Sequence, residues 1–355
     1  MRRLALLFAI LPPADGTPTE TLTRMNAPPL LKNLAACLLV LALGIATAAE
    51  VDSFTHRHPL KDSAPFLDQV VNVWLEEAVI EANRPSLISG LVENGNPGCD
   101  EARLMDALKS RLAGYLIGQL EDFVDQSTWL DTIHTTFEES IYRDFDFSES
   151  PTVVLTRRLA VLLRLGTVYL GSDKLGHFFT EGHTYFEHYL EKDEQSALDY
   201  GELMESSFYG ELTTGIFSYA DLAANLNGLR FWNAILARKP DPIVNTATVK
   251  PYIGCRAGKW HRLREFHWSE YVDPAWDEAL NCNVYADEIL LEKVSRRITQ
   301  ASDGKRCPLA KADRAMLERK YGELLPLLFN RSGPRAAHAF DSILRKYWDE
   351  ILQEL

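Results

Sequence analysis

Long segments of this 355-residue chain repeat apolar residues at steps of three and four, the spacing that places them on one face of an α-helix. Six segments share this spacing: residues 66–82, 102–124, 153–170, 286–298, 310–329 and 339–355. No alternating, strand-like pattern has comparable strength. Arg157, Arg158 and Arg164 interrupt the third segment, which predicts a core helix rather than a membrane span. The sequence therefore predicts an all-α fold, with a single helical domain at residues 49–355.

Residues 1–48 have the layout of a secretory signal peptide. After Met25 come Lys32, an unbroken apolar run at residues 34–45, and small residues at 46–49. We expect cleavage after residue 48 or 49 and export to the periplasm or beyond. The apolar run is shorter than the roughly 20 residues that a transmembrane helix needs, so we expect no span in the mature chain. The stretch before Met25 has no periodic pattern, which makes Met25 an alternative start.

Removal of the signal peptide would also remove Cys37 and leave four cysteines, Cys99, Cys255, Cys282 and Cys307. An even number of cysteines in an exported chain predicts two disulfides, for which three pairings are open. None of the four has the C-x-x-C spacing of a zinc or redox motif. We therefore expect the cysteines to be structural.

The composition changes at residues 240–283, where several prolines and two of the cysteines fall between helical segments. Such a stretch predicts an irregular connector, with room for a short hairpin, pinned by a disulfide. We expect it to join two helical groups of one domain rather than two independent domains.

The chain is acidic, with 50 Asp and Glu against 37 Lys and Arg and a net charge of −13 at pH 7. The basic residues form no cluster along the sequence. This balance argues against nucleic acid and anionic lipid headgroups as partners.

A stripe of polar residues runs along the segment GSDKLGHFFTEGHTYFE at residues 171–187. Asp173, His177 and Glu181 follow one another at four-residue steps, so they share one face of a helix that turns about 100° per residue. A solvent-exposed stripe usually mixes Lys or Arg with Glu for pairing, and this face contains no such cation. The stripe is therefore a candidate functional face as well as a candidate solvated one.

Local signals support a helix in this segment and a close neighbour for it. Ser172 is a good N-cap residue, and Asp173 in the first turn complements the helix dipole. Gly176 and Gly182 lie inside the helix, where each costs about 1 kcal/mol relative to alanine. We therefore expect another stretch of backbone to pack closely against the two glycines.

A second polar set lies in the segment SYADLAANLNGLRFW at residues 218–232. Ser218 and Asp221 match a capping box, which predicts a helix start. Residues 222–229 carry no charge, so the helix is expected to be buried and its polar side chains to need partners. Asp221 and Asn225 share one face at a four-residue step, and we expect that face to meet the first stripe.

Carboxylates and a histidine that converge between packed helices are typical of a metal site in helical proteins, with Zn²⁺, Mn²⁺ or Fe as suitable ions. Four side chains are candidate ligands: Asp173, His177, Glu181 and Asp221. Glu205, between the two segments, is a candidate catalytic base or further ligand, and Asn225 would orient a ligand or substrate. A metal at such a site would lower the pKa of a bound water and so favour hydrolysis.

Residues 172–178, SDKLGHF, resemble the Asp-Lys-x-x-His element of VanZ-like envelope proteins and the Asp-Lys-x-Gly-His-Phe motif of small bacterial envelope proteins. The resemblance covers seven residues. VanZ-like proteins are embedded in the membrane, and the chain departs from them because its mature part has no expected span. The resemblance implies a cell-envelope setting, in which Asp173, Lys174 and His177 belong together.

Two functions remain open on the sequence. The first is an exported, metal-dependent hydrolase that acts on an envelope component such as a lipid, a glycan or a peptide. The second is a non-catalytic periplasmic protein that binds an envelope partner, with the same polar residues forming a buried hydrogen-bond network.

Overall fold

The computed structural model describes five stretches of the chain: residues 49–85, 98–114, 118–206, 211–243 and 249–337. The expected signal peptide at 1–48 and the expected helix at 339–355 lie outside these residues. All described elements belong to one compact unit, Ile45–Leu355.

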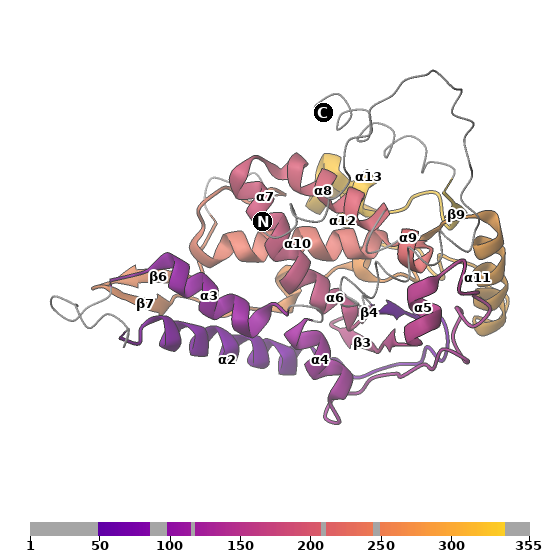
Figure 1. Ribbon diagram of the computed structural model, residues 1–355, viewed down its shortest axis with the longest axis horizontal. Helices are drawn as coiled ribbons and strands as arrows, with labels where there is room; N and C mark the ends of the chain where they lie inside the picture. The colour runs from indigo at the N-terminus through magenta and orange to yellow at the C-terminus, as the bar shows by residue number, and fades with distance from the viewer. Residues whose placement is uncertain (1–48, 86–97, 115–117, 207–210, 244–248, 338–355) are drawn as a thin grey trace, which may run out of the picture. The chain divides into compact units, whose positions relative to one another are not determined.

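Helices dominate the described chain (Figure 1). The α-helices are α2 (Ala64–Ala82), α3 (Glu101–Leu112), α4 (Gln119–Gln126), α5 (Pro151–Thr156), α6 (Asp173–Gly176), α7 (Gly182–Glu191), α8 (Glu194–Ser206), α9 (Glu211–Thr214), α10 (Tyr219–Leu236), α11 (Glu288–Ala301), α12 (Arg314–Tyr321) and α13 (Leu325–Leu328). A π-helical turn, η1 (His177–Glu181), joins α6 to α7, and the short 3₁₀ helices are η2 (Trp268–Glu270), η3 (Pro274–Trp276) and η4 (Gly322–Leu324).

The prediction of an all-α fold is wrong, because strands form four small sheets among the described residues. The strands are β1 (Glu50–Val51), β2 (Leu159–Ala160), β3 (Leu162–Leu165), β4 (Val168–Gly171), β5 (Ile216–Phe217), β6 (Ile253–Arg256), β7 (Lys259–Arg262), β8 (Val284–Tyr285) and β9 (Arg335–Ala336). Strand β1 pairs with β2 and β8 with β9 in parallel; β3 with β4, β5 with β8 and β6 with β7 are antiparallel. The fold is therefore mixed α/β.

The prediction of one helix at residues 153–170 is also wrong. These residues form the short helix α5, the strand β2 and the hairpin β3–β4. In the hairpin Leu165 pairs with Val168, so Gly166 and Thr167 make a two-residue turn. Gly166 has a positive φ of 61°, which suits the first central position of a type II′ turn. Apolar residues lie on both faces of this hairpin, interrupted by Arg164, and their spacing resembles that of a buried helix. Periodicity therefore could not separate the two structures.

The segment 102–124 also differs from the prediction, because it contains two helices rather than one. Helix α3 ends where Ala113 takes an extended conformation, and α4 begins after Gly118, which is also extended. Helices α2 and α11 lie where the apolar spacing predicts them.

Two disulfides are present, as predicted, and they settle the pairing. Cys99 bonds Cys255, which ties the β6–β7 hairpin to the start of α3. Cys282 bonds Cys307, which ties the end of the connector to the loop after α11. None of the described helices has the length and apolar character needed to cross a bilayer.

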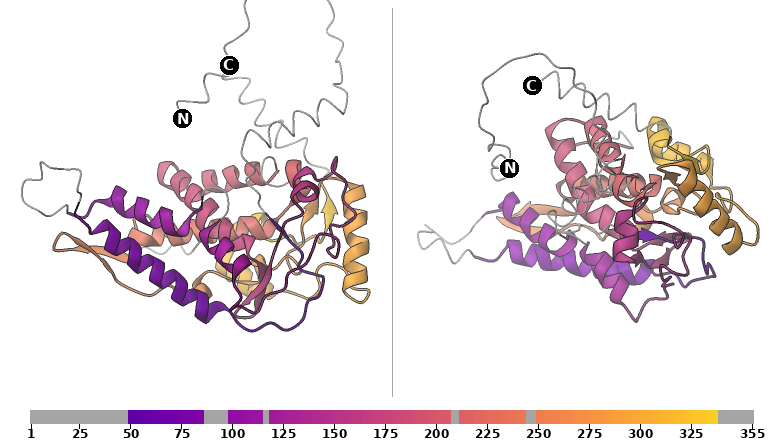
Figure 2. Two further views of the ribbon diagram at one scale, coloured as in Figure 1. Left: turned by 60° about the horizontal axis from the view of Figure 1, so that its bottom comes forward. Right: turned by 45° about the vertical axis from the view of Figure 1, so that its right-hand side comes forward.

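Helix α10 lies at the centre of the described elements, and the continuous helix α6–η1–α7 packs along it (Figures 1 and 2). Fifteen of its residues are buried, which confirms the prediction of a buried helix. The predicted close approach is also confirmed: a Cβ added to Gly182 would lie 2.5 Å from the Cα of Gly228 on α10. A Cβ on Gly118 would lie 2.5 Å from the Cα of Gly176, so α4 approaches the same helix closely.

This crossing gives a first testable prediction. A Cβ at Gly228 would lie 2.0 Å from the carbonyl oxygen of Phe178 and 2.8 Å from the Cα of Gly182, and neither backbone group can move without separating the helices. We expect Gly228→Ala to lower the free energy of unfolding by about 1–3 kcal/mol in equilibrium urea unfolding. Gly254→Ala is a suitable control, because the three atoms nearest to its Cβ would all belong to the exposed side chain of Leu263, which can move. Equal effects of the two substitutions would contradict the close packing.

Candidate metal centre

The helix that carries Asp173 and His177 begins without the predicted side-chain cap. Ser172 precedes α6, but its hydroxyl donates to the Asp125 carboxylate and accepts from the Val161 amide. The hydroxyl is thus used to fix the start of the helix against α4 and the chain before β3. Asp173 occupies the first turn, as predicted.

The helix then widens into the π turn η1, where the Gly182 amide donates to the carbonyl of His177. A π turn inserts one residue relative to an α-helix. The helical wheel used for the sequence therefore no longer applies beyond His177. Glu181, at the end of η1, is only partly buried, and among the described residues no hydrogen bond or ion pair joins it to Asp173, His177 or Asp221. Burial raises the pKa of Glu181, and the charges of His177 and Asp221 also act on that pKa.

Helix α10 supplies the facing residues, beginning at a side-chain cap that was predicted. The Ser218 hydroxyl accepts from the Asp221 amide at 3.2 Å. The Asp221 carboxylate does not fold back to complete a capping box; it points to the other helix instead. Asp221 therefore belongs both to the first turn of a helix and to the contact between the two segments.

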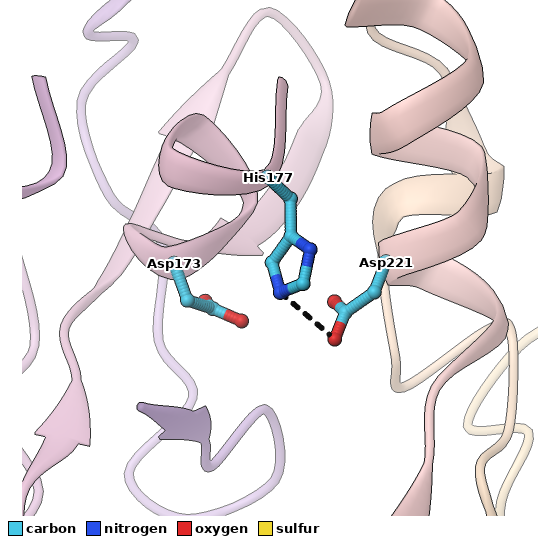
Figure 3. Close-up of side chains that lie close together, drawn as sticks. All are labelled: Asp173, His177 and Asp221. Carbon is cyan, nitrogen blue, oxygen red and sulfur yellow. Dashed lines mark ion pairs between the residues drawn. The ribbon is translucent and has the colours of Figure 1, made fainter. Parts of the chain in front are cut away.

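Asp173, His177 and Asp221 converge in the interior (Figure 3). Each is buried, and each offers one ligand atom within 4.8 Å of those of the other two. His177 Nε2 lies 3.2 Å from Asp221 Oδ2. The prediction that the two segments face each other inside the protein is confirmed.

The ammonium group of Lys174 lies beside this triad and is fully buried. Its Nζ lies 2.5 Å from Asp173 Oδ2, 2.5 Å from Asp221 Oδ1 and 2.6 Å from Glu278 Oε1. Three carboxylates from distant parts of the chain thus surround one lysine. This arrangement agrees with the expectation that Asp173, Lys174 and His177 belong together.

The charges of His177 and Asp221 stabilise each other. Burial alone would lower the pKa of His177, but the Asp221 carboxylate outweighs it and raises that pKa to about 10. Burial would raise the pKa of Asp221, but His177 and Lys174 hold it well below its usual range. Without a metal, therefore, an imidazolium and a carboxylate face each other.

Carboxyl groups outnumber basic groups around the triad. We call the following described residues the acidic cluster: Glu50, Asp173, Lys174, His177, Glu205, Asp221 and Glu278. Burial raises the pKa of Asp173 to about 7 and, with help from Asp221, that of Glu205 to about 8. Burial, with the charges of Glu278 and Asp221, also raises the pKa of Glu50 well above its usual range. The surplus negative charge must be neutralised by protons or by a bound cation.

Glu205 gives a prediction for the pH dependence of stability. Its folded-state pKa of about 8 exceeds the unfolded value near 4.5, so the folded protein loses stability as the pH rises through this interval. In chelator, we expect the free energy of unfolding to fall from pH 5 to pH 8.5, and to fall less in Glu205→Gln. Asp173 and Glu50 have raised pKa values too, so the variant should retain part of the slope. Equal slopes for the two proteins would contradict the burial of an ionisable Glu205.

Asn225 reaches His177 from one turn further along α10, with the amide 3.1 Å from His177 Nδ1. In one amide orientation its Oδ1 accepts from Nδ1–H and its Nδ2 donates to the hydroxyl of Tyr185. In the other, Nδ2 donates to Nδ1 and to the carbonyls of His177 and Asp221. A metal-bound histidine usually donates its second ring N–H, and an imidazolium donates from both ring nitrogens. The first orientation therefore suits both a metal at Nε2 and the charged, metal-free ring, whereas the second needs a neutral ring with its proton on Nε2.

Glu205, the candidate base, is buried near the end of α8. Its Oε1 accepts from the Ser218 amide at 2.8 Å, next to the start of α10. The charges of Asp221 and His177 both act on its pKa. The structure thus brings Glu205 to the border of the triad, where it could exchange a proton.

Glu278 and Glu50 are cluster members that the sequence analysis missed. Glu278 lies in the predicted connector, where its Oε1 accepts from the Ser218 hydroxyl and its Oε2 from Asn283 Nδ2. Glu50 lies on β1, immediately after the expected cleavage site. Neither stands in a helical pattern, so no spacing signal connected them to Asp173 or His177.

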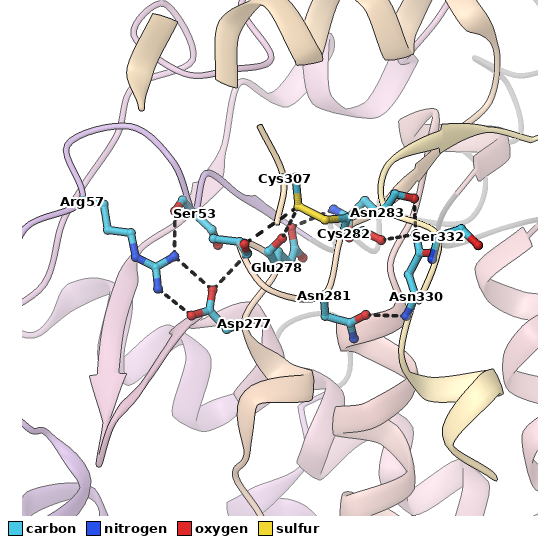
Figure 4. Close-up of a disulfide and its surroundings, with 12 residues drawn as sticks. Ser53, Arg57, Asp277, Glu278, Asn281, Cys282, Asn283, Cys307, Asn330 and Ser332 are labelled. Atoms are coloured by element: carbon cyan, nitrogen blue, oxygen red, sulfur yellow. Dashed lines mark hydrogen bonds and ion pairs between the residues drawn. A yellow bond between two sulfur atoms is a disulfide. The ribbon is translucent and has the colours of Figure 1, made fainter. Parts of the chain in front are cut away.

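The segment that carries Glu278 is held from both sides (Figure 4). Asp277 receives two hydrogen bonds from the guanidinium of Arg57. A few residues later Cys282 forms its disulfide with Cys307. These contacts fix the position of the Glu278 carboxylate although the segment has little regular structure.

The donor set fits a divalent cation. One imidazole nitrogen and carboxylate oxygens suit Zn²⁺, Mn²⁺ or Fe, and carboxyl groups outnumber basic groups in the acidic cluster. Asp173 Oδ1 is buried and has no hydrogen-bond partner among the described residues, so it is available as a ligand. Asp173, His177 and Asp221 are therefore the residues that could hold a metal.

Comparison of the chain with protein-family models, with curated proteins and with solved structures gives no significant match. The function must therefore be inferred from the acidic cluster itself.

Proposed function

We propose that the protein is a metal-dependent hydrolase of the bacterial cell envelope, with a divalent cation held by Asp173, His177 and Asp221. The observation that carries the proposal is the convergence of three buried ligand atoms within 4.8 Å in a cluster with surplus negative charge. Zn²⁺, Mn²⁺ and Fe all suit these ligands.

The envelope setting rests on two further observations. Both disulfides are typical of chains that fold in an oxidising compartment, such as the periplasm or the exterior. The Asp-Lys-x-Gly-His-Phe resemblance of residues 173–178 agrees with this setting. The substrate would be an envelope lipid, glycan or peptide.

Each residue has a role in the proposed reaction. The bound cation would supply Lewis acidity and lower the pKa of a coordinated water. Asn225 would fix the orientation of His177 by accepting from Nδ1–H. Glu205, at the border of the triad, would exchange the proton of the attacking water.

One observation favours the alternative, a non-catalytic envelope protein that binds a partner. Lys174 already neutralises carboxylates of the triad, and protons on Glu50, Asp173 and Glu205 could neutralise the rest. In that case the acidic cluster would be a buried polar network that organises the fold.

Metal content separates the two functions. Protein purified from its native compartment without chelator is expected to contain about one zinc, manganese or iron per chain by elemental analysis. Hydrolysis of reporter esters, phosphodiesters, glycosides or peptides should disappear with chelator and return with the metal. Protein without metal, and without any metal-stimulated hydrolysis, would contradict the proposal and favour the network.

A further inference from the structure

The position of Lys174 raises a question about how a cation could enter. Two of the three oxygens around its Nζ belong to Asp173 and Asp221, which are also proposed metal ligands. The ammonium lies in a fully buried side chain, so it cannot turn out to solvent while the fold is intact. A bound divalent cation must therefore share two carboxylates with a positive charge that stays nearby.

Electrostatics makes this sharing unfavourable. Like charges a few ångströms apart in a buried site repel strongly, because neither water nor salt screens them well. The ammonium also reduces the negative charge that attracts the cation. Lys174 should therefore weaken metal binding although it stabilises the metal-free fold.

Glu278 differs from the other two partners of Lys174. It is not part of the triad, and its carboxylate is fixed by Ser218 and Asn283 as well as by Lys174. The disulfide at Cys282 and the Arg57–Asp277 pair hold its segment in place (Figure 4). Glu278 is thus the one of the three carboxylates that can keep the ammonium when a metal takes the others.

We propose that Lys174 is a tethered counter-ion that competes with the divalent cation for Asp173 and Asp221, and that Glu278 holds the ammonium aside when the cation binds. This inference rests on the proposed metal site and describes how its affinity is set. The two residues act in opposite directions: Lys174 weakens metal binding, and Glu278 favours it.

The opposite signs give the test. Binding of Mn²⁺ and of Zn²⁺ to the purified full chain is measured by isothermal titration calorimetry at pH 7.5. We expect Lys174→Met to lower the dissociation constant at least about tenfold, because it removes the repulsion. Glu278→Gln should raise it about threefold or more, and Lys174→Arg, which keeps the charge, should not tighten binding.

The control variants remove lysine–carboxylate ion pairs at other places in the fold. Lys320 lies 2.5 Å from Asp273, and Lys293 pairs with Glu149, both away from the acidic cluster. Lys320→Met and Glu149→Gln should leave the dissociation constant unchanged. Circular dichroism and thermal unfolding establish that each variant is folded, and Glu278→Gln tests the proposal by itself if Lys174→Met does not fold.

The outcomes separate this inference from the proposed function. Tighter binding by Lys174→Met together with weaker binding by Glu278→Gln supports the competition. Metal binding by Lys174→Met alone, with none by the unsubstituted chain, also supports the competition but contradicts the proposed function. A wild-type chain that binds metal with the same affinity as Lys174→Met overturns the competition and leaves the proposed function intact. If neither chain binds Mn²⁺ or Zn²⁺, both ideas are overturned.

Discussion

Replacing His177 by alanine is expected to abolish stoichiometric binding of a divalent cation. The change removes the nitrogen ligand of the triad and leaves Asp221 Oδ2 without its 3.2 Å partner. The remaining carboxylates then repel one another and are already engaged by Lys174. Equilibrium dialysis with Mn²⁺ or Zn²⁺, followed by elemental analysis, measures the loss.

His183 provides a matched control on the same helix. It is also buried, but its ring packs edge-on against Trp232, with the two ring centroids 4.8 Å apart, and it takes no part in the acidic cluster. His183→Ala should keep its metal. If the cluster is only a polar network, His177→Ala should instead lower stability by about 1–3 kcal/mol through unsatisfied partners, with no metal in either protein.

Replacing Lys174 by methionine is expected to lower the free energy of unfolding of the metal-free protein by about 3–5 kcal/mol. The substitution leaves the carboxylates of Asp173, Asp221 and Glu278 buried without the cation that they share. Chemical unfolding in the presence of chelator measures the change.

A saturating divalent cation should restore part of the stability of Lys174→Met, because it neutralises the same carboxylates. Lys320→Met, which removes a lysine paired with Asp273, is the control and should show no metal-dependent recovery. A loss below about 1 kcal/mol in Lys174→Met would show that the three carboxylates do not depend on the ammonium.

The contact between the two polar segments could be predicted from the sequence because its signals are local. Four-residue spacing placed Asp221 and Asn225 on one face of α10, and an uncharged run predicted that this helix is buried. The glycines at 176 and 182 predicted a close backbone neighbour, and α4 and α10 supply it. Each of these conclusions needs only residues within one or two helical turns.

The fold class was less predictable, because the apolar residues of the segment 153–170 recur at steps that suit a helix as well as a buried hairpin. Its hairpin turn depends on one glycine, Gly166. A single glycine does not outweigh an apolar spacing that suits a helix equally well. Short two-residue strands such as β1 and β9 carry no periodicity at all. Small sheets of this kind are defined by tertiary contacts rather than by sequence pattern.

The acidic cluster is larger than the sequence suggested for the same reason. Glu278 and Glu50 come from segments more than 100 residues away from Lys174 in sequence, on opposite sides, and no spacing links them. The π turn at η1 ends at Glu181, so the regular α-helical spacing that the wheel assumed does not hold there. Positions fixed by long-range packing and by an irregular turn could not be read from periodicity.

Anomalous diffraction from crystals grown with Zn²⁺ tests the central claim most directly. The claim predicts a zinc peak about 2.0–2.2 Å from His177 Nε2 and from carboxylate oxygens of Asp173 and Asp221. Data collected on both sides of the zinc absorption edge identify the ion. A cluster without a peak, in which Lys174 still contacts all three carboxylates, would contradict the claim.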